Sequence, residues 1–179
     1  MKQRLSKHDW LQHGLRALAG SGHEGLKADL LARSLQVSRG SFYWHFKNLH
    51  DFHVALLAYW KEHTTERTIA ELNTHVEDAG RLTEIMLRSF ASDDRLEQAM
   101  RRWAVQNRSV KRAVAGVDKV RIDYLTTLLV NVGVPTTVAG ARAAFIYAAS
   151  LGRSQIDKNT ISELTPQELE KIAELMQQI

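Results

Sequence analysis

The stretch VSRGSFYWHFKNLHDF (residues 37–52) combines a dense aromatic cluster with basic and hydroxyl side chains. Four of the thirteen Phe, Tyr and Trp residues of the chain fall within residues 42–46, next to Arg39 and Lys47. A fully buried segment is seldom this polar, and a fully solvated one is seldom this aromatic. The pattern therefore predicts a short helix that buries one face and offers the other to a partner.

The residues on either side place this helix in a helix-turn-helix. A helix is expected over about residues 27–35, followed by a tight turn at Gln36 and Val37. Ser38 is expected to cap the short helix that follows. Gln36 occupies the turn position where glycine often supplies a left-handed backbone. Asn48 begins a long helix that reaches about His75.

The rest of the sequence also predicts helices, because apolar residues recur every three or four positions and alternating strand patterns are absent. Ser6 and Asp9 form a capping box at the start of a first helix over residues 7–20. Pro135 and Pro166 each suit the first turn of a helix. Further helices are expected at about residues 81–91, 94–106, 109–132, 136–154 and 166–178. The fold class is all-α.

Apolar stripes predict which residues face the interior. Most of the large apolar side chains between the first helices and the last are expected in the core. The predicted inward residues are Trp10, Leu11, Leu15, Leu18, Leu30, Leu31, Leu35, Phe42, Phe46, Trp60, Met86, Phe90, Met100, Trp103, Tyr124 and Phe145. The last helix carries a further apolar stripe that must be buried, either in a dimer interface or against the core of its own subunit: Leu169, Ile172, Leu175 and Met176.

Charge is unevenly distributed along the chain. Residues 1–48 carry eight Lys and Arg against three Asp and Glu, whereas residues 49–179 carry sixteen against seventeen. A positive field in the first quarter suggests a polyanionic partner, either nucleic acid or a membrane surface. A solvated basic surface without a partner is the alternative.

The composition and the motifs of the sequence argue against several classes of protein. The chain has no cysteine, which excludes disulfides and thiolate sites and agrees with a reducing, cytoplasmic setting. Neither a signal peptide nor an apolar run long enough to span a membrane is recognisable. No catalytic signature stands out, so an enzyme is not expected. The eight histidines precede residue 76 without a metal-binding pattern, so neither a metal nor a cofactor is expected.

The segment SLQVSRGSFYWHFKNLHDF resembles the signature of the TetR/AcrR family of bacterial transcriptional regulators. The matching positions are Ala32, Val37, Ser38, Gly40, Phe42, Tyr43, His45, Phe46 and Lys47. The sequence departs from the signature at Gln36, where glycine is usual, and at Leu49, where a phosphate-binding lysine is common. The resemblance covers about residues 6–55.

The resemblance implies a DNA-binding helix-turn-helix domain at residues 1–50 and a helical ligand-binding and dimerisation domain at residues 51–179. It further implies a homodimer through the last two helices, which binds a palindromic operator as a repressor and leaves it when a small-molecule effector binds. The DNA-binding candidates are Lys27, Ser38, Arg39, Gly40, Ser41, Tyr43, Trp44, His45 and Lys47. An aromatic core with solvated polar neighbours is the plainer reading of this cluster, and Trp44 could pack against the first helix instead.

Residues 51–179 contain weaker indications of function. Trp103, Gln106 and Tyr124 are candidates for binding the effector, because each joins an apolar body or neighbourhood to a polar group. Asp118, Arg121 and Asp123 form either a buried ion-pair network or surface charge, and surface charge is favoured. A helical small-molecule or metal carrier without sequence-specific DNA binding is the alternative function.

Overall fold

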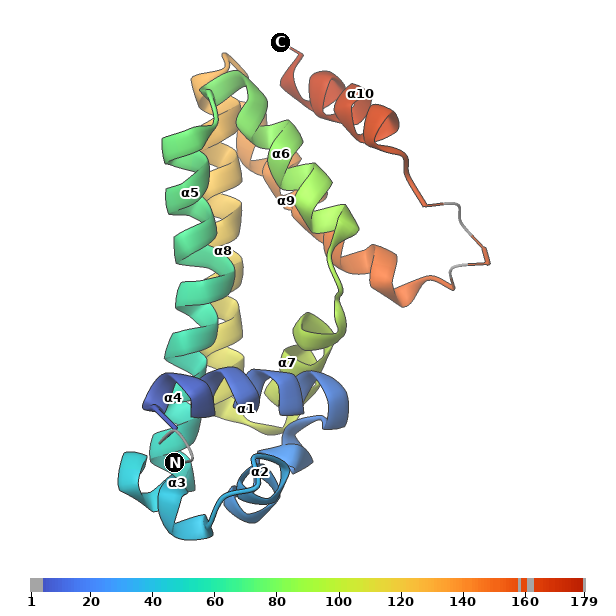
Figure 1. The fold of residues 1–179 in the computed structure, drawn as a ribbon. Coiled ribbons are helices and arrows are strands. Elements are labelled where there is room, and N and C mark those ends of the chain that lie inside the picture. Colours follow the sequence, from blue (N-terminus) through green and yellow to red (C-terminus); the bar gives the residue numbers. More distant parts are fainter. Residues whose placement is uncertain (1–4, 158, 161–162, 179) are drawn as a thin grey trace. The chain divides into compact units, whose positions relative to one another are not determined.

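The computed structural model describes residues 5–157, 159, 160 and 163–178, and every regular element within these residues is helical (Figure 1). This confirms the all-α prediction. Contacts divide the chain into two compact units, Met1–Glu66 with Asp94–Gly116 and Arg67–Asp93 with Val117–Ile179. No helix in the described residues is both long and apolar enough to cross a membrane.

The first unit contains the helix-turn-helix together with a later segment of the chain. Its elements are α1 (Lys7–Ser21), η1 (His23–Leu26), α2 (Ala28–Ser34), α3 (Arg39–His45), α4 (Leu49–Lys61), η2 (Glu62–Glu66), α7 (Arg95–Gln106) and the first turns of α8 (Arg108–Asn131). In Figure 1, α1 crosses α4 and α7 lies beside α1. Residues 94–116 therefore fold with the N-terminal helices although they are distant in sequence.

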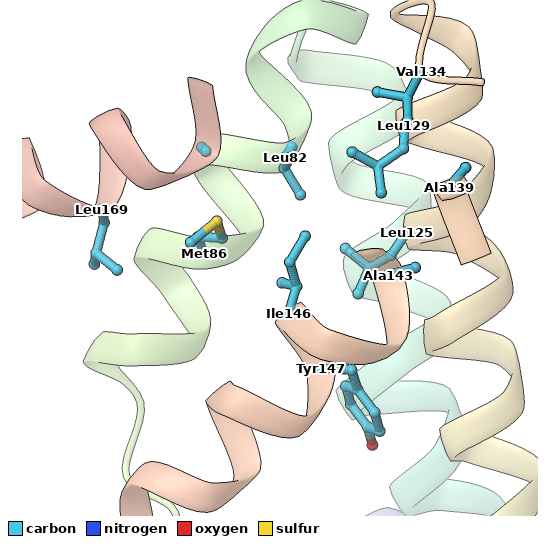
Figure 2. Close-up of a cluster of buried hydrophobic side chains, with 11 residues drawn as sticks. Leu82, Met86, Leu125, Leu129, Val134, Ala139, Ala143, Ile146, Tyr147 and Leu169 are labelled. Carbon is cyan, nitrogen blue, oxygen red and sulfur yellow. The ribbon is translucent and has the colours of Figure 1, made fainter. Parts of the chain in front are cut away.

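The second unit contains the remaining helices. They are α5 (Arg67–His75), α6 (Asp78–Ala91), the rest of α8, α9 (Thr136–Gly152), η3 (Arg153–Gln155) and α10 (Pro166–Gln177). Figure 2 shows the buried cluster that joins α6, α8, α9 and α10, in which Leu82, Leu129 and Ile146 converge. Tyr124 Oη of α8 donates a hydrogen bond of 2.7 Å to Asn73 Oδ1 of α5.

The helix ends follow local capping chemistry. Ser6 and Asp9 form the predicted capping box, and Thr165 and Glu168 form a second one. Asn48 caps α4 by accepting from the amide of Asp51. The expected helix from Asn48 to His75 is helical throughout but is interrupted by the π-turn η2. Inserted turns of this kind are often found at functional sites.

An aromatic cluster forms the core of the first unit. Trp10 of α1 contacts Phe42 of α3 edge to face, with ring centroids 5.5 Å apart. Phe46 and Phe52 pack against the same ring, and all four side chains are buried. Gly14 permits this packing, because a Cβ at that position would lie 2.7 Å from Phe52. Burial of these rings stabilises the helix-turn-helix.

Two predicted core residues lie on the surface instead. Leu30 is 42% exposed and Phe145 is 64% exposed. Helical spacing alone predicted them inward. The neighbouring positions Leu31 and Ile146 take the buried places, because a helix rotated by one residue buries a different edge of the same stripe.

Candidate nucleic-acid interface

The turn between α2 and α3 has the backbone that a helix-turn-helix requires. Gln36 has φ 54, so the expected left-handed position is left-handed despite the absence of glycine. The amide of Gln36 donates to the carbonyl of Arg33, and that of Val37 donates to Ala32, each at 3.0 Å. These bonds satisfy the carbonyls at the end of α2 and direct α3 away from it.

α3 separates its aromatic residues into an inner and an outer face. Phe42 is fully buried and Phe46 at the end of the helix is buried as well. Tyr43 is 44% exposed and Trp44 is 70% exposed, and Arg39 and Lys47 are exposed too. Such an exposed tryptophan beside cationic side chains is typical of a recognition surface rather than of a solvated helix. Trp44 is therefore not packed into the core of the unit.

Arg39 is held in place by two neighbours. Its Nε lies 3.0 Å from Asp29 Oδ1 of α2, and its Nη2 donates a 3.0 Å hydrogen bond to Tyr43 Oη. The guanidinium also lies over the Tyr43 ring, with Cζ 5.4 Å from the ring centroid. The hydrogen bond to Tyr43 and then the charge of Asp29 raise the pKa of Arg39. Sequence reasoning missed Asp29, since nothing in the spacing shows that it meets α3.

Gly40 and the two serines leave the start of α3 open. A Cβ at Gly40 would meet only Ser38 Oγ, at 3.7 Å, so another molecule can approach the backbone closely at this point. Ser38 occupies the N-cap position of α3 as predicted, but its side chain is exposed and does not make the expected capping hydrogen bond. Ser41 is half-buried and its amide donates to the carbonyl of Ser38.

The remaining candidates make contacts within the protein. Lys27 immediately precedes α2 and its Nζ lies 2.9 Å from Glu24 Oε2. His45 is half-buried, with Nε2 2.9 Å from the carbonyl oxygen of Leu5. The backbone amide of Lys47 donates to Asp51 Oδ2 at 3.1 Å. The side chain of Lys47 is exposed.

The fold concentrates positive charge more strongly than the sequence order does. The first compact unit carries fifteen Lys and Arg against eight Asp and Glu, a net charge of +7. The second carries nine against twelve, a net charge of −3. The difference from the sequence-based count arises because the basic segment around residues 98–117 folds with the N-terminal helices.

The effector candidates lie in different surroundings. Trp103 is buried in the first unit, where its ring meets His53 edge to face at a centroid distance of 4.9 Å. Gln106 is exposed at the end of α7. Tyr124 is half-buried in the second unit, where its hydroxyl is bound to Asn73. The three candidate effector-binding residues are therefore divided between the two compact units.

A polar cluster in the second unit differs from expectation. The buried Tyr147 donates a 2.6 Å hydrogen bond to Asp118 Oδ1, and Arg121 Nη1 lies 3.4 Å from the same hydroxyl. Burial raises the pKa of Tyr147 to about 12. Asp118 and Arg121 are therefore half-buried rather than surface charges, whereas Asp123 is exposed and pairs with Lys119. No group of three or more His, Asp or Glu side chains that could hold a metal ion is found among the described residues.

Solved structures share this fold at low sequence identity. A transcriptional regulator from Rhodococcus sp. Rha1 matches with TM-score 0.73 and 20% identity, over 96% of this chain and 94% of that one. A TetR-family transcriptional regulator from Streptomyces coelicolor matches with TM-score 0.69 and 18% identity, over 94% of each chain. The superantigen PfiT matches with TM-score 0.70 and 18% identity, over 98% of this chain and 97% of that one.

The chain therefore has the fold of TetR-family transcriptional regulators. No protein-family model matches the sequence, and no curated protein matches it. A shared fold at this identity does not carry function with it, since function depends on particular sites.

Proposed function

We propose that this chain is a DNA-binding transcriptional regulator of the TetR type, which acts as a repressor and responds to a small-molecule effector. The observation that carries this proposal is the outer face of α3. Arg39, Tyr43 and Trp44 are exposed on a helix whose opposite face, with Phe42, is buried. A helix of this kind can enter the major groove while its inner face holds it to the rest of the unit.

The candidate side chains divide into two roles. Lys27, Ser38, Ser41, Tyr43, His45 and Lys47 supply hydroxyl, imidazole or ammonium groups for phosphate oxygens, which position the protein without reading sequence. Arg39, Gly40 and Trp44 lie nearest the bases. An arginine can bind guanine O6 and N7 with two parallel hydrogen bonds, and an aromatic ring can contact a thymine methyl group.

We assign DNA binding to residues 1–50 and effector binding and dimerisation to residues 51–179. A dimer through α9 and α10 is supported by apolar side chains left on their surfaces. Phe145 and Val138 of α9 and Leu175 of α10 are exposed, and a Cβ at Gly140 would meet nothing within 4 Å. Two-fold symmetry matches a palindromic operator whose half-sites lie about one helical turn apart.

Effector binding is assigned to the body, with Trp103, Gln106 and Tyr124 as the candidate contacts. An effector that binds better to a conformer in which the two recognition helices are wrongly spaced favours that conformer and releases the DNA. α4 follows α3 in the chain and is followed by η2 and α5, so this segment is the route by which we propose that a change in the body reaches the recognition helix.

Selection of duplexes from a randomised pool, followed by a salt titration on the selected duplex, tests the proposal. We expect one palindromic sequence to be enriched and its affinity to fall steeply with salt, because the contacts displace counterions. A helical small-molecule carrier, the alternative function, enriches no sequence. That outcome, or an affinity that does not change between low and physiological salt, overturns the proposal.

A further inference from the structure

A second basic surface lies in the same compact unit as the helix-turn-helix. Between residues 98 and 117 the sequence has five Lys and Arg and no Asp or Glu. Arg102 in α7 and Arg108, Lys111 and Arg112 in the first turns of α8 are all exposed. We call these four residues the α7–α8 corner. In the described part of the chain, the three residues from α8 form no ion pair.

The corner is electrostatically unfavourable for the isolated protein. Arg108, Lys111 and Arg112 share one face of a 24-residue helix, at spacings where like charges repel. They also lie at the N-terminal end of that helix, where the backbone dipole disfavours cations. The opposite face is the one that packs, since Val110, Val114 and Val117 are buried. The three cations therefore make no contribution to packing, and a bound polyanion is what would offset their repulsion.

The end of α7, which carries Arg102 of the corner, lies beside η1, the short helix that precedes α2. Trp103, one turn before the end of α7, stacks on His23 of η1 with ring centroids 6.5 Å apart and an interplanar angle of 4°. η1 ends at Leu26, and Lys27, a phosphate-binding candidate, follows it directly. The end of α7 therefore lies near η1, in the same compact unit as the helix-turn-helix, although Lys27 itself is paired with Glu24.

We propose that the α7–α8 corner binds DNA phosphates that flank the groove entered by α3, and so extends the footprint of each subunit beyond its half-site. The proposal rests on the proposed function, because it needs α3 to bind a duplex. DNA is favoured over other polyanions because the corner belongs to the same compact unit as the helix-turn-helix, and this unit carries a net charge of +7. The corner reads no bases, so it adds affinity without adding sequence preference.

The test compares two lengths of the duplex that selection from the randomised pool identifies. One is trimmed to its minimal bound length, and the other carries about ten extra base pairs, roughly one helical turn, at each end. We expect the unmodified protein to bind the longer duplex at least about tenfold more tightly at low salt. The slope of log K against log salt should steepen by about 0.9 for each added phosphate contact.

The variant Lys111→Gln/Arg112→Gln should lose the gain on the longer duplex and keep its affinity for the shorter one within about twofold. Lys119→Gln/Lys171→Gln removes the same charge from exposed positions of the second unit and serves as the matched control, which should keep the gain. Circular dichroism and thermal unfolding of both variants check that they fold.

Three results would overturn the inference and leave the proposed function standing. They are equal binding of both lengths by the unmodified protein, a gain that persists in the corner variant, and a gain that disappears equally in the control. Failure to select any duplex overturns the proposed function, and the inference with it. Binding of the shorter duplex tests the proposed DNA binding by α3 alone, and the gain on the longer duplex tests the α7–α8 corner.

Discussion

The carboxylate of Asp29 on α2 lies 3.0 Å from the guanidinium Nε of Arg39 on α3. This pair joins the two helices of the helix-turn-helix on their exposed side. Because both side chains are largely solvent-exposed, it contributes little to stability. The ion pair instead orients the Arg39 side chain, because it fixes one edge of the guanidinium that is proposed to reach the bases.

Replacement of Asp29 by Asn should raise affinity for DNA in general and lower discrimination. The substitution removes a negative charge that repels phosphates and releases Arg39 from its orientation. We expect the ratio of affinities for the selected and scrambled duplexes to fall roughly tenfold, near the low end for removal of one bidentate base interaction. An unchanged ratio in Asp29→Asn would show that Asp29 does not position Arg39.

Arg39 and Lys47 should differ in how their replacement affects binding. Arg39→Ala should weaken the selected duplex far more than a scrambled one, because it removes a base contact. Lys47→Ala should weaken both alike and reduce the salt slope by about 0.9 for each phosphate that the lysine neutralises. Parallel titrations on the two duplexes measure this, and equal effects of the two substitutions would contradict the assigned roles.

Replacement of Gln36 by glycine should stabilise the protein. The φ of 54 at Gln36 costs an L-residue about 1–2 kcal/mol, which glycine avoids at some cost in unfolded-state entropy. Gln36→Gly should therefore raise the free energy of unfolding by up to about 1 kcal/mol, a Tm increase of roughly 2–4 °C. Gln36→Val, which is β-branched, should lower it. A lower free energy of unfolding for Gln36→Gly, or a higher one for Gln36→Val, would mean that the turn does not keep its left-handed backbone.

Two glycines of α1 provide a matched pair. Gly14→Ala places a methyl group 2.7 Å from Phe52 and 3.0 Å from Leu56 in the buried contact with α4. Overpacking of this kind costs about 1–3 kcal/mol. Gly20→Ala meets nothing within 4 Å and should stabilise by up to about 1 kcal/mol through helix propensity. Denaturant unfolding compares them, and equal effects would exclude a tight crossing of α1 and α4.

His53 should make the protein less stable in mild acid. Burial, with smaller effects of His50 and His23, lowers the pKa of His53 in the folded state. The unfolded chain then binds more protons, so the stability from this group is complete above about pH 6.5 and is lost as the pH falls below that value through the lowered pKa of the folded state. Burial lowers the pKa of His13 in the same direction.

The variant His53→Phe keeps a ring against Trp103 and removes the titratable group. Its unfolding free energy should fall less than that of the unmodified protein between about pH 7.5 and about pH 5.5. Asp9, Glu24 and Glu168 have lowered pKa values and lose their contributions only at lower pH, outside this range. An identical pH dependence in the variant would show that His53 is not the source.

The sequence by itself determined most of the helices, the caps at Ser6 and Asn48, and the inner and outer faces of α3. These depend on residues within one or two turns of one another, such as Ser6 with Asp9 and Asn48 with Asp51. The buried Phe42 and the left-handed Gln36 belong to the same short-range pattern.

Only the tertiary structure decided which segments share a surface. It joined Asp29 to Arg39 and folded residues 94–116 with the N-terminal helices. It also turned Leu30 and Phe145 outward. The physical reason is that periodicity fixes a stripe on each helix, whereas the rotation of that stripe and the partner it meets depend on packing with residues far away in the chain.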